Sequence, residues 1–96
     1  MKLTNRQRRQ LRGLANPLNP IIQIGKEGAS ENLFYTIDQA LKAHELIKVH
    51  VHTTSPLDVQ TLAEMIVDKT KSYLVQIVGF NLTLYRPSEK VKIDLS

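Results

Sequence analysis

The sequence predicts a two-layer α/β sandwich with element order α-β-α-β-α-β-β and a mixed four-stranded sheet. Segments with the apolar spacing of helices alternate with short β-branched segments, and the chain closes on a hairpin pattern. Strands separated by helices favour parallel neighbours through right-handed crossovers, whereas a hairpin adds an antiparallel pair. With 96 residues there is room for one domain, which we expect to span 1–96.

The first helix is expected at 5–15. Thr4 followed three residues later by Gln7 has the pattern of a capping box. At about 100° per residue, the apolar side chains fall on one arc of this helix and four arginines fall on the opposite arc. The apolar set is Leu3, Leu11, Leu14 and Ala15, and the arginines are Arg6, Arg8, Arg9 and Arg12. One face should therefore pack on a core while the other presents guanidinium groups to solvent.

Prolines at 17 and 20 end this helix, and the β-branched segment 21–24 predicts a strand. A second helix should follow Ser30, a good N-cap residue, and end near 43–45. The segment 46–53 alternates between two faces, which indicates a half-buried strand. Its apolar face carries Ile47, Val49 and Val51, and its polar face carries Lys48, His50 and His52.

A third helix is expected to start at Ser55-Pro56, with Ser55 as N-cap and Asp58 completing the cap, and to end near Thr70. The segments 73–78 and 82–85 then predict a hairpin closed by a turn at 79–81. Pro87 stops the last strand, and 91–95 is expected to form an extended tail.

Positive charge is concentrated at the N-terminal end of the chain. Six of the 13 basic residues precede the first acid, Glu27, and the rest of the chain holds seven basic residues against all nine acids. A one-sided distribution of this kind is typical of a protein that binds a polyanion. A solvated helix face or a membrane-surface contact would give the same composition, so both remain alternatives at this point.

The amino-acid composition narrows the class of protein further. The chain has no cysteine, which excludes disulfides, thiolate zinc sites and thiol catalysis. Its apolar runs fall well short of the roughly 20 residues needed to cross a bilayer. The first residues become more charged rather than more apolar, unlike a signal peptide. We therefore expect a cytoplasmic protein without a membrane partner, and a monomer.

The loop Gly25-Lys26-Glu27-Gly28 is the first candidate binding site, because it lies between a predicted strand and a predicted helix. Glycines permit positive φ and remove Cβ atoms that would keep a ligand away. The helix that follows adds free N–H groups and the positive end of its dipole. In KH domains, a G-x-x-G loop clamps the backbone of single-stranded RNA. An ordinary strand-to-helix turn would look the same, but the arginine-rich helix before it favours binding.

Catalytic, metal and cofactor sites are not expected. The sequence lacks the glycine-rich phosphate-binding motifs and the G-x-S-x-G nucleophile motif. His50 and His52 share a strand face, but a metal needs a third ligand and only the distant His44 is available as another imidazole. Arg86, after the last strand, is a candidate for a phosphate contact or for stacking on a base. Few Phe and Tyr side chains are available for stacking, so binding should be mainly to backbone and shape.

Four stretches carry a resemblance that covers nearly the whole chain. They are 3–15, with Leu3-Thr4, Gln7, Leu11 and Gly13-Leu14-Ala15; the loop at 25–28; 40–49, with Ala40-Leu41 and His44 through Val49; and 75–87, with Val75 through Gly79 and Leu84 through Pro87. In order and spacing these residues resemble the CRM (chloroplast RNA splicing and ribosome maturation) domain, in its YhbY-like, single-domain bacterial form.

The resemblance implies a fold similar to the C-terminal domain of translation initiation factor three. It also implies RNA contact through Gly25, Lys26 and Gly28, with the basic helix beside the loop. Bacterial members of this family associate with precursors of the large ribosomal subunit, so the implied partner is large-subunit ribosomal RNA in pre-ribosomal particles.

Together these observations predict a non-enzymatic RNA-binding protein that contacts ribosomal RNA backbone and takes part in large-subunit assembly. The candidate RNA-binding residues are Arg6, Arg8, Arg9, Arg12, Gly25, Lys26, Gly28 and Arg86. The alternative is a protein-interaction module whose basic helix docks on a ribosomal or other RNA-associated protein.

Overall fold

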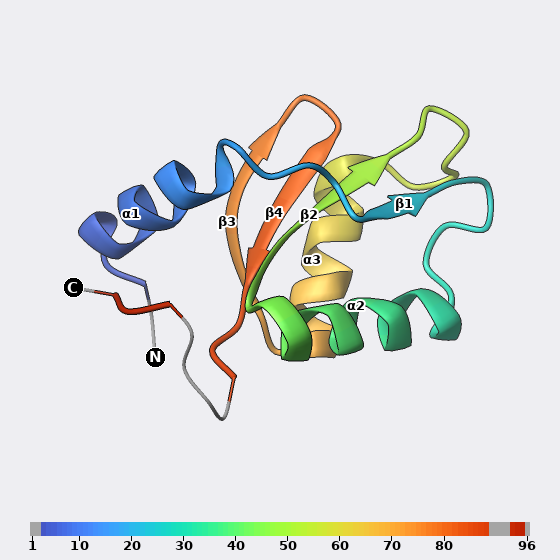
Figure 1. The fold of residues 1–96 in the computed structure, drawn as a ribbon. Helices are drawn as coiled ribbons and strands as arrows, with labels where there is room; N and C mark the ends of the chain where they lie inside the picture. The colour runs from blue at the N-terminus through green and yellow to red at the C-terminus, as the bar shows by residue number, and fades with distance from the viewer. Residues whose placement is uncertain (1–2, 89–92, 96) are drawn as a thin grey trace.

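The computed structural model describes residues 3–88 and 93–95, and it confirms the predicted element order and the mixed four-stranded sheet (Figure 1). The elements are α1 (Asn5–Ala15), β1 (Ile22–Ile24), α2 (Glu31–His44), β2 (Leu46–Val51), α3 (Val59–Thr70), β3 (Tyr73–Val78) and β4 (Asn81–Tyr85). The strand order is β1-β2-β4-β3. β1 runs parallel to β2, and the other two pairs are antiparallel.

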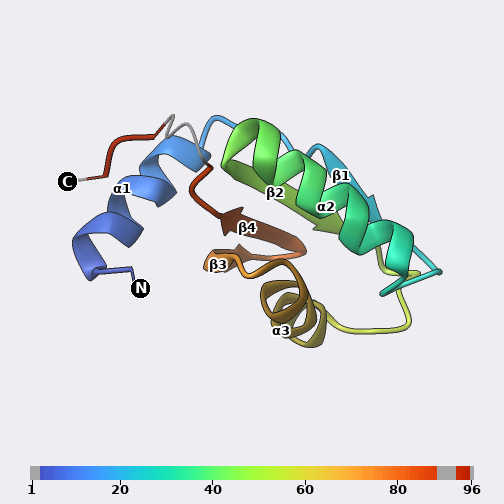
Figure 2. The ribbon, with the colours of Figure 1, turned by 90° about the horizontal axis from the view of Figure 1, so that it is seen from below.

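The main core lies between the sheet and the pair α2 and α3, which pack against the same face (Figure 2). Ile37 of α2, Ile66 of α3 and Val49 of β2 are fully buried there. α1 packs instead against the opposite face, where Leu11 and Ala15 meet Leu46, Val75 and Tyr85. Because α1 reaches only these residues at one end of the sheet, much of that face is left without a covering helix.

The capping box of α1 is confirmed, since Thr4 and Gln7 bond each other's backbone N–H groups at 3.0 Å. The expectation that Leu14 packs with Leu11 and Ala15 is wrong, because the Leu14 side chain is 45% exposed. α1 meets the sheet over a narrow stripe, and Leu14 lies outside it. The structure thus leaves an apolar side chain at the surface near the end of this helix.

The start of α3 also differs from the prediction. Asp58, not Ser55, is the N-cap, and its carboxylate accepts from Thr61 N–H at 2.8 Å. Hydrogen bonding from the Thr61 side chain and from its backbone N–H lowers the pKa of Asp58. Ser55 instead closes a local turn, with its hydroxyl donating to the Leu57 carbonyl at 2.8 Å. The segment between β2 and α3 is therefore a loop, and its Pro56 packs against Gly28.

Smaller differences concern strand ends and the tail. β1 begins at Ile22, β2 ends at Val51, and β4 begins one residue early, at Asn81. Of the predicted extended tail, 91–92 lies outside the described residues, and 93–95 is not a strand. Within the described ranges, none of the helices has the length and apolar character needed to cross a membrane.

A buried carboxylate holds the C-terminal segment in place. Glu45, fully buried between α2 and β2, accepts hydrogen bonds from Ser88 N–H at 3.0 Å and Ile93 N–H at 2.9 Å. The Ser88 hydroxyl also donates to it. Glu45 has a positive φ of 66° and caps α2 through its own N–H. It therefore turns the chain from α2 into β2 and fixes the segment after β4 at the same point.

Candidate nucleic-acid interface

The loop at 25–28 connects β1 to α2 and forms a tight turn, in which Gly28 N–H donates to the Gly25 carbonyl at 3.0 Å. Lys26 and Glu27 are exposed at its tip. Ser30 caps α2 by accepting from Leu33 N–H at 3.1 Å. The loop thus presents a lysine beside the N-terminal end of a 14-residue helix, where the helix dipole favours an anion.

The two glycines of this loop have different roles in the structure. Gly28 is buried at φ +59°, and a Cβ there would lie 2.9 Å from the Cγ atom of Pro56. Gly25 is partly exposed, and a Cβ there would meet only the Thr54 hydroxyl, at 3.8 Å. Gly28 therefore fixes the shape of the loop against the β2–α3 segment. Gly25 is the glycine that leaves room beside the chain at the surface.

An open hollow of about 470 Å³ runs along β1, the loop and the first turns of α2. Its lining includes Gln23, Gly25, Lys26 and Asn32. β1 is one of the two edge strands of the sheet, and an edge strand leaves one row of backbone groups without a ladder partner. The hollow therefore combines polar backbone, a lysine and a helix N-terminus, which bind phosphate oxygens, with the carboxylate of Glu27, which partly offsets the lysine charge.

Three of the four α1 arginines, Arg6, Arg9 and Arg12, are exposed as predicted. Arg8 is not on the outer arc: it is half-buried, and its guanidinium donates to the Val75 carbonyl at 3.0 Å and also to the Leu74 carbonyl. The register of β3 against β4 shifts at this point, which is the mark of a β-bulge. A bulge leaves backbone groups unpaired, and Arg8 satisfies them. Arg8 thus attaches α1 to the sheet.

Arg86 is also held within the fold, with its side chain 18% exposed. Its guanidinium donates to the Asp38 carboxylate at 2.8 Å, to the Thr70 carbonyl at 2.7 Å and to the Asp38 carbonyl at 3.1 Å. The hydrogen bond from Arg86 lowers the pKa of Asp38. The structure therefore places Arg86 as a link between β4 and both core helices. Neighbouring Tyr85 is buried, and burial raises its pKa.

The resemblance implied that the basic helix lies beside the loop at 25–28, and the structure shows that it does not. α1 and the loop at 25–28 lie at opposite ends of the molecule in both views (Figures 1 and 2). The long dimension of the protein is 38 Å. The exposed arginines and Lys26 are therefore two separate positive regions, and any ligand that touches both must span the sheet between them.

The polar face of β2 lies between these two regions, and sequence reasoning considered it only as a metal site. In the described part of the chain, no group of three or more His, Cys, Asp or Glu side chains could hold a metal ion. His50 donates to the Asn81 side-chain oxygen at 2.9 Å, and His52 donates to that of Gln23. The two imidazoles meet edge to face, with centroids 5.0 Å apart. Strand alternation predicted the outward direction of these histidines but not their amide partners.

Known proteins resemble this chain over nearly its whole length. Residues 3–86 match the family model of the CRS1/YhbY (CRM) domain. A Haemophilus influenzae protein named "RNA-binding protein" is 43% identical over 93 residues, which is 97% of this chain and 94% of that protein. "Probable RNA-binding protein YqeI" of Bacillus subtilis is 42% identical over 90 residues, 94% of each chain.

Among solved structures, the solution structure of the hypothetical protein SAV1595 from Staphylococcus aureus superposes with a TM-score of 0.82. It shares 45% sequence identity, and the match covers 99% of this chain and 100% of that one. The family model, the relatives and this structure all extend over the sheet and its three helices. The chain belongs to the CRS1/YhbY (CRM) domain family.

Proposed function

We propose that this protein is a non-enzymatic RNA-binding protein that holds RNA mainly through its sugar-phosphate backbone. The observation that carries the proposal is the open hollow beside Gly25 and Lys26 at the N-terminal end of α2. A phosphate in this hollow would meet a lysine, the helix dipole and free backbone groups together. The names of the Haemophilus and Bacillus relatives support RNA as the ligand.

The geometry divides the candidate residues into two groups. Lys26 and Gly25 would contact the RNA at the loop, and Arg6, Arg9 and Arg12 would attract and contact it at α1, because all five are at least partly exposed. The second group would act by holding these contacts in place. It consists of Gly28 against Pro56, Arg8 on β3 and Arg86 on Asp38.

We further propose that the RNA is large-subunit ribosomal RNA in pre-ribosomal particles, and that the protein acts there as a cytoplasmic monomer. This is what the resemblance to bacterial YhbY-like proteins implies. Crosslinking the protein to RNA in cells and sequencing the bound RNA tests it. Enrichment of large-subunit precursor sequences is expected, and enrichment of other RNA classes alone would contradict this target.

The salt dependence of binding tests the phosphate contacts. Each single-strand phosphate contact contributes about −0.7 to the slope of log affinity against log salt. Lys26→Ala should therefore weaken binding and make the slope shallower by about 0.7. Lys42→Ala is the matched control, since Lys42 is an exposed lysine near the other end of α2, paired with Asp38 at 3.3 Å. An equal effect of both substitutions would move the contact away from the loop.

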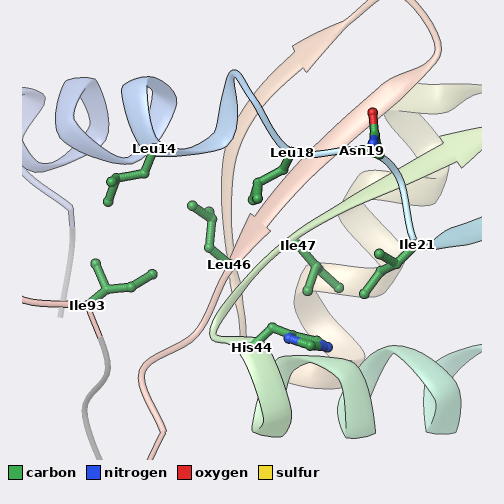
Figure 3. Close-up of a pocket in the computed structure, with 8 residues that line it drawn as sticks. All are labelled: Leu14, Leu18, Asn19, Ile21, His44, Leu46, Ile47 and Ile93. Atoms are coloured by element: carbon green, nitrogen blue, oxygen red, sulfur yellow. The ribbon is translucent and has the colours of Figure 1, made fainter.

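A second candidate function, docking on an RNA-associated protein, is favoured by an apolar hollow of about 280 Å³ (Figure 3). Leu14, Leu18 and Ile21 are 45%, 38% and 54% exposed around it. Their side chains lie along the segment from the end of α1 to β1, across from His44 and Ile93. Under this alternative, the protein forms complexes with a partner protein that survive ribonuclease treatment, and Leu18→Glu should abolish them. Complexes that are lost on ribonuclease treatment would instead support the RNA-binding function.

A further inference from the structure

The open face of the sheet forms a polar strip between the two positive regions. Sheet register places Gln23 of β1, His50 of β2 and Asn81 of β4 side by side, and places Lys48 beside Thr83. We call Lys48, His50 and His52, with the flanking Gln23 and Asn81, the β2 strip. α1 packs on the next row, which includes Leu46 and Tyr85, and reaches the strip only through its C-cap. Gln23 and His52 are exposed and Lys48, His50 and Asn81 are partly exposed, whereas Thr83 beside Lys48 is buried.

The ends of the strip meet the two regions assigned to RNA backbone. At one end, the Lys48 ammonium group donates to the carbonyl of Asn16, the C-cap of α1, at 3.5 Å. At the other end, the backbone N–H of His52 donates to the carbonyl of Ile24 at 2.8 Å, and Ile24 is the residue just before the loop at 25–28. β2 runs from the α1 end of the sheet toward that loop (Figure 1). A chain that follows the strip would therefore connect α1 with the loop.

The charge and chemistry of the strip suit nucleobases better than phosphates alone. Within 3–88 and 93–95, no acidic residue occupies a position on the strip, and Lys48 is its one cation. The imidazole centroids of His50 and His52 lie 5.0 Å apart with their planes at 86°, so bases that stack on both rings must turn relative to each other between one ring and the next. Histidine rings are among the aromatic surfaces on which unpaired RNA bases stack.

Hydrogen bonds fix the imidazoles before any ligand arrives. Each ring uses one nitrogen to donate to an amide oxygen, His50 to Asn81 and His52 to Gln23. In the neutral ring the other nitrogen is then an acceptor, suited to a base N–H or a ribose 2′-hydroxyl. The amide NH₂ groups of Gln23 and Asn81 are donors for base acceptors. The rings are therefore oriented in advance, which lowers the entropic cost of binding.

We propose that unpaired RNA crosses the β2 strip between α1 and the loop, with its bases stacked on His50 and His52. This inference rests on the proposed function and deepens it, since it names single-stranded RNA as the ligand class. It also places bases, and not only phosphates, in contact with the protein. Bases inside a duplex are stacked on each other and paired, so they cannot take this position.

The test compares three probes: a short single-stranded RNA of mixed sequence, the same strand in a duplex, and an abasic strand of equal length. The wild-type protein should bind the single strand most tightly. Replacing both histidines, His50→Ala and His52→Ala, should weaken binding of the single strand by about tenfold or more. It should leave binding of the abasic strand and the salt slope unchanged. His44→Ala, which removes an exposed histidine outside the strip, should match the wild type.

A second variant separates stacking from damage to the fold. His52 is exposed, so His52→Phe keeps an aromatic face at a position that tolerates substitution. It should retain binding of the single strand, whereas His52→Ala should not. Equal losses for both substitutions, or a double-alanine variant that binds like the wild type, would overturn the inference. In the latter case, weakened binding by Lys26→Ala would show that the proposed function still holds; a wild type that binds none of the probes would refute both.

Discussion

Two sets of charged residues in this protein have opposite environments: Glu45 and Arg86, which hold the chain around the end of β4 and which we call the C-terminal anchor, and Lys26 and Glu27 of the loop at 25–28. At the anchor, Glu45 and Arg86 are largely buried, and within the described residues each side chain makes at least three hydrogen bonds to other parts of the chain. At the loop, Lys26 and Glu27 are exposed at the tip of a turn. The comparison teaches that residue type alone does not separate a binding cation from a structural one. The partners that the fold supplies decide between them.

The largest expected effect tests the anchor side of this comparison. Glu45→Ala leaves the N–H groups of Ser88 and Ile93 without their acceptor, at a cost of about 3 kcal/mol or more in the free energy of unfolding. For a domain of this size that lowers Tm by more than about 10 °C, measurable by thermal unfolding. Glu45→Gln keeps one acceptor oxygen and should cost less. A stable Glu45→Ala variant would mean that the anchor is not structural.

Substitution of the two loop glycines by alanine should have the next largest effect on stability. Gly28→Ala combines a positive φ with a 2.9 Å approach to Pro56, and should cost about 1–3 kcal/mol of stability. Gly25→Ala meets no close atom and should leave stability nearly unchanged, while it reduces RNA affinity by obstructing the surface. Urea unfolding and RNA titration on both variants measure this contrast. If Gly25→Ala binds RNA like the wild type, Gly25 is not at the contact.

Much of the fold could be predicted because its signals are local. The caps at Thr4 and Ser30 lie within four residues of the groups they bond, and the alternation along β2 needs no knowledge of its neighbours. The predicted start of α3 was wrong because Ser55 and Asp58 are both good N-cap residues, and the sequence does not show which of them caps the helix. The structure adopts the Asp58 cap, with Pro56 packed against the distant Gly28.

The site was predicted less well, because it depends on contacts between distant residues. Helical spacing placed Arg8 on the solvent-facing arc, because it carries no information on the bulge in β3 whose carbonyl groups the long Arg8 side chain reaches. Likewise, no local pattern pairs Arg86 with Asp38, or Glu45 with Ser88, more than 40 residues away in the chain. The distance between α1 and the loop follows from the sheet order, which sequence alone did not fix.

We propose that the exposed cations at the loop and at α1 hold RNA phosphates while the paired arginines, Arg8 and Arg86, hold the fold. The most direct measurement is the salt slope of binding to single-stranded RNA for wild type and for the combined variant Arg6→Ala, Arg9→Ala and Arg12→Ala. Three lost contacts should make the slope shallower by about 2, with stability little changed. An unchanged slope in a folded variant would mean that these three arginines make no phosphate contact.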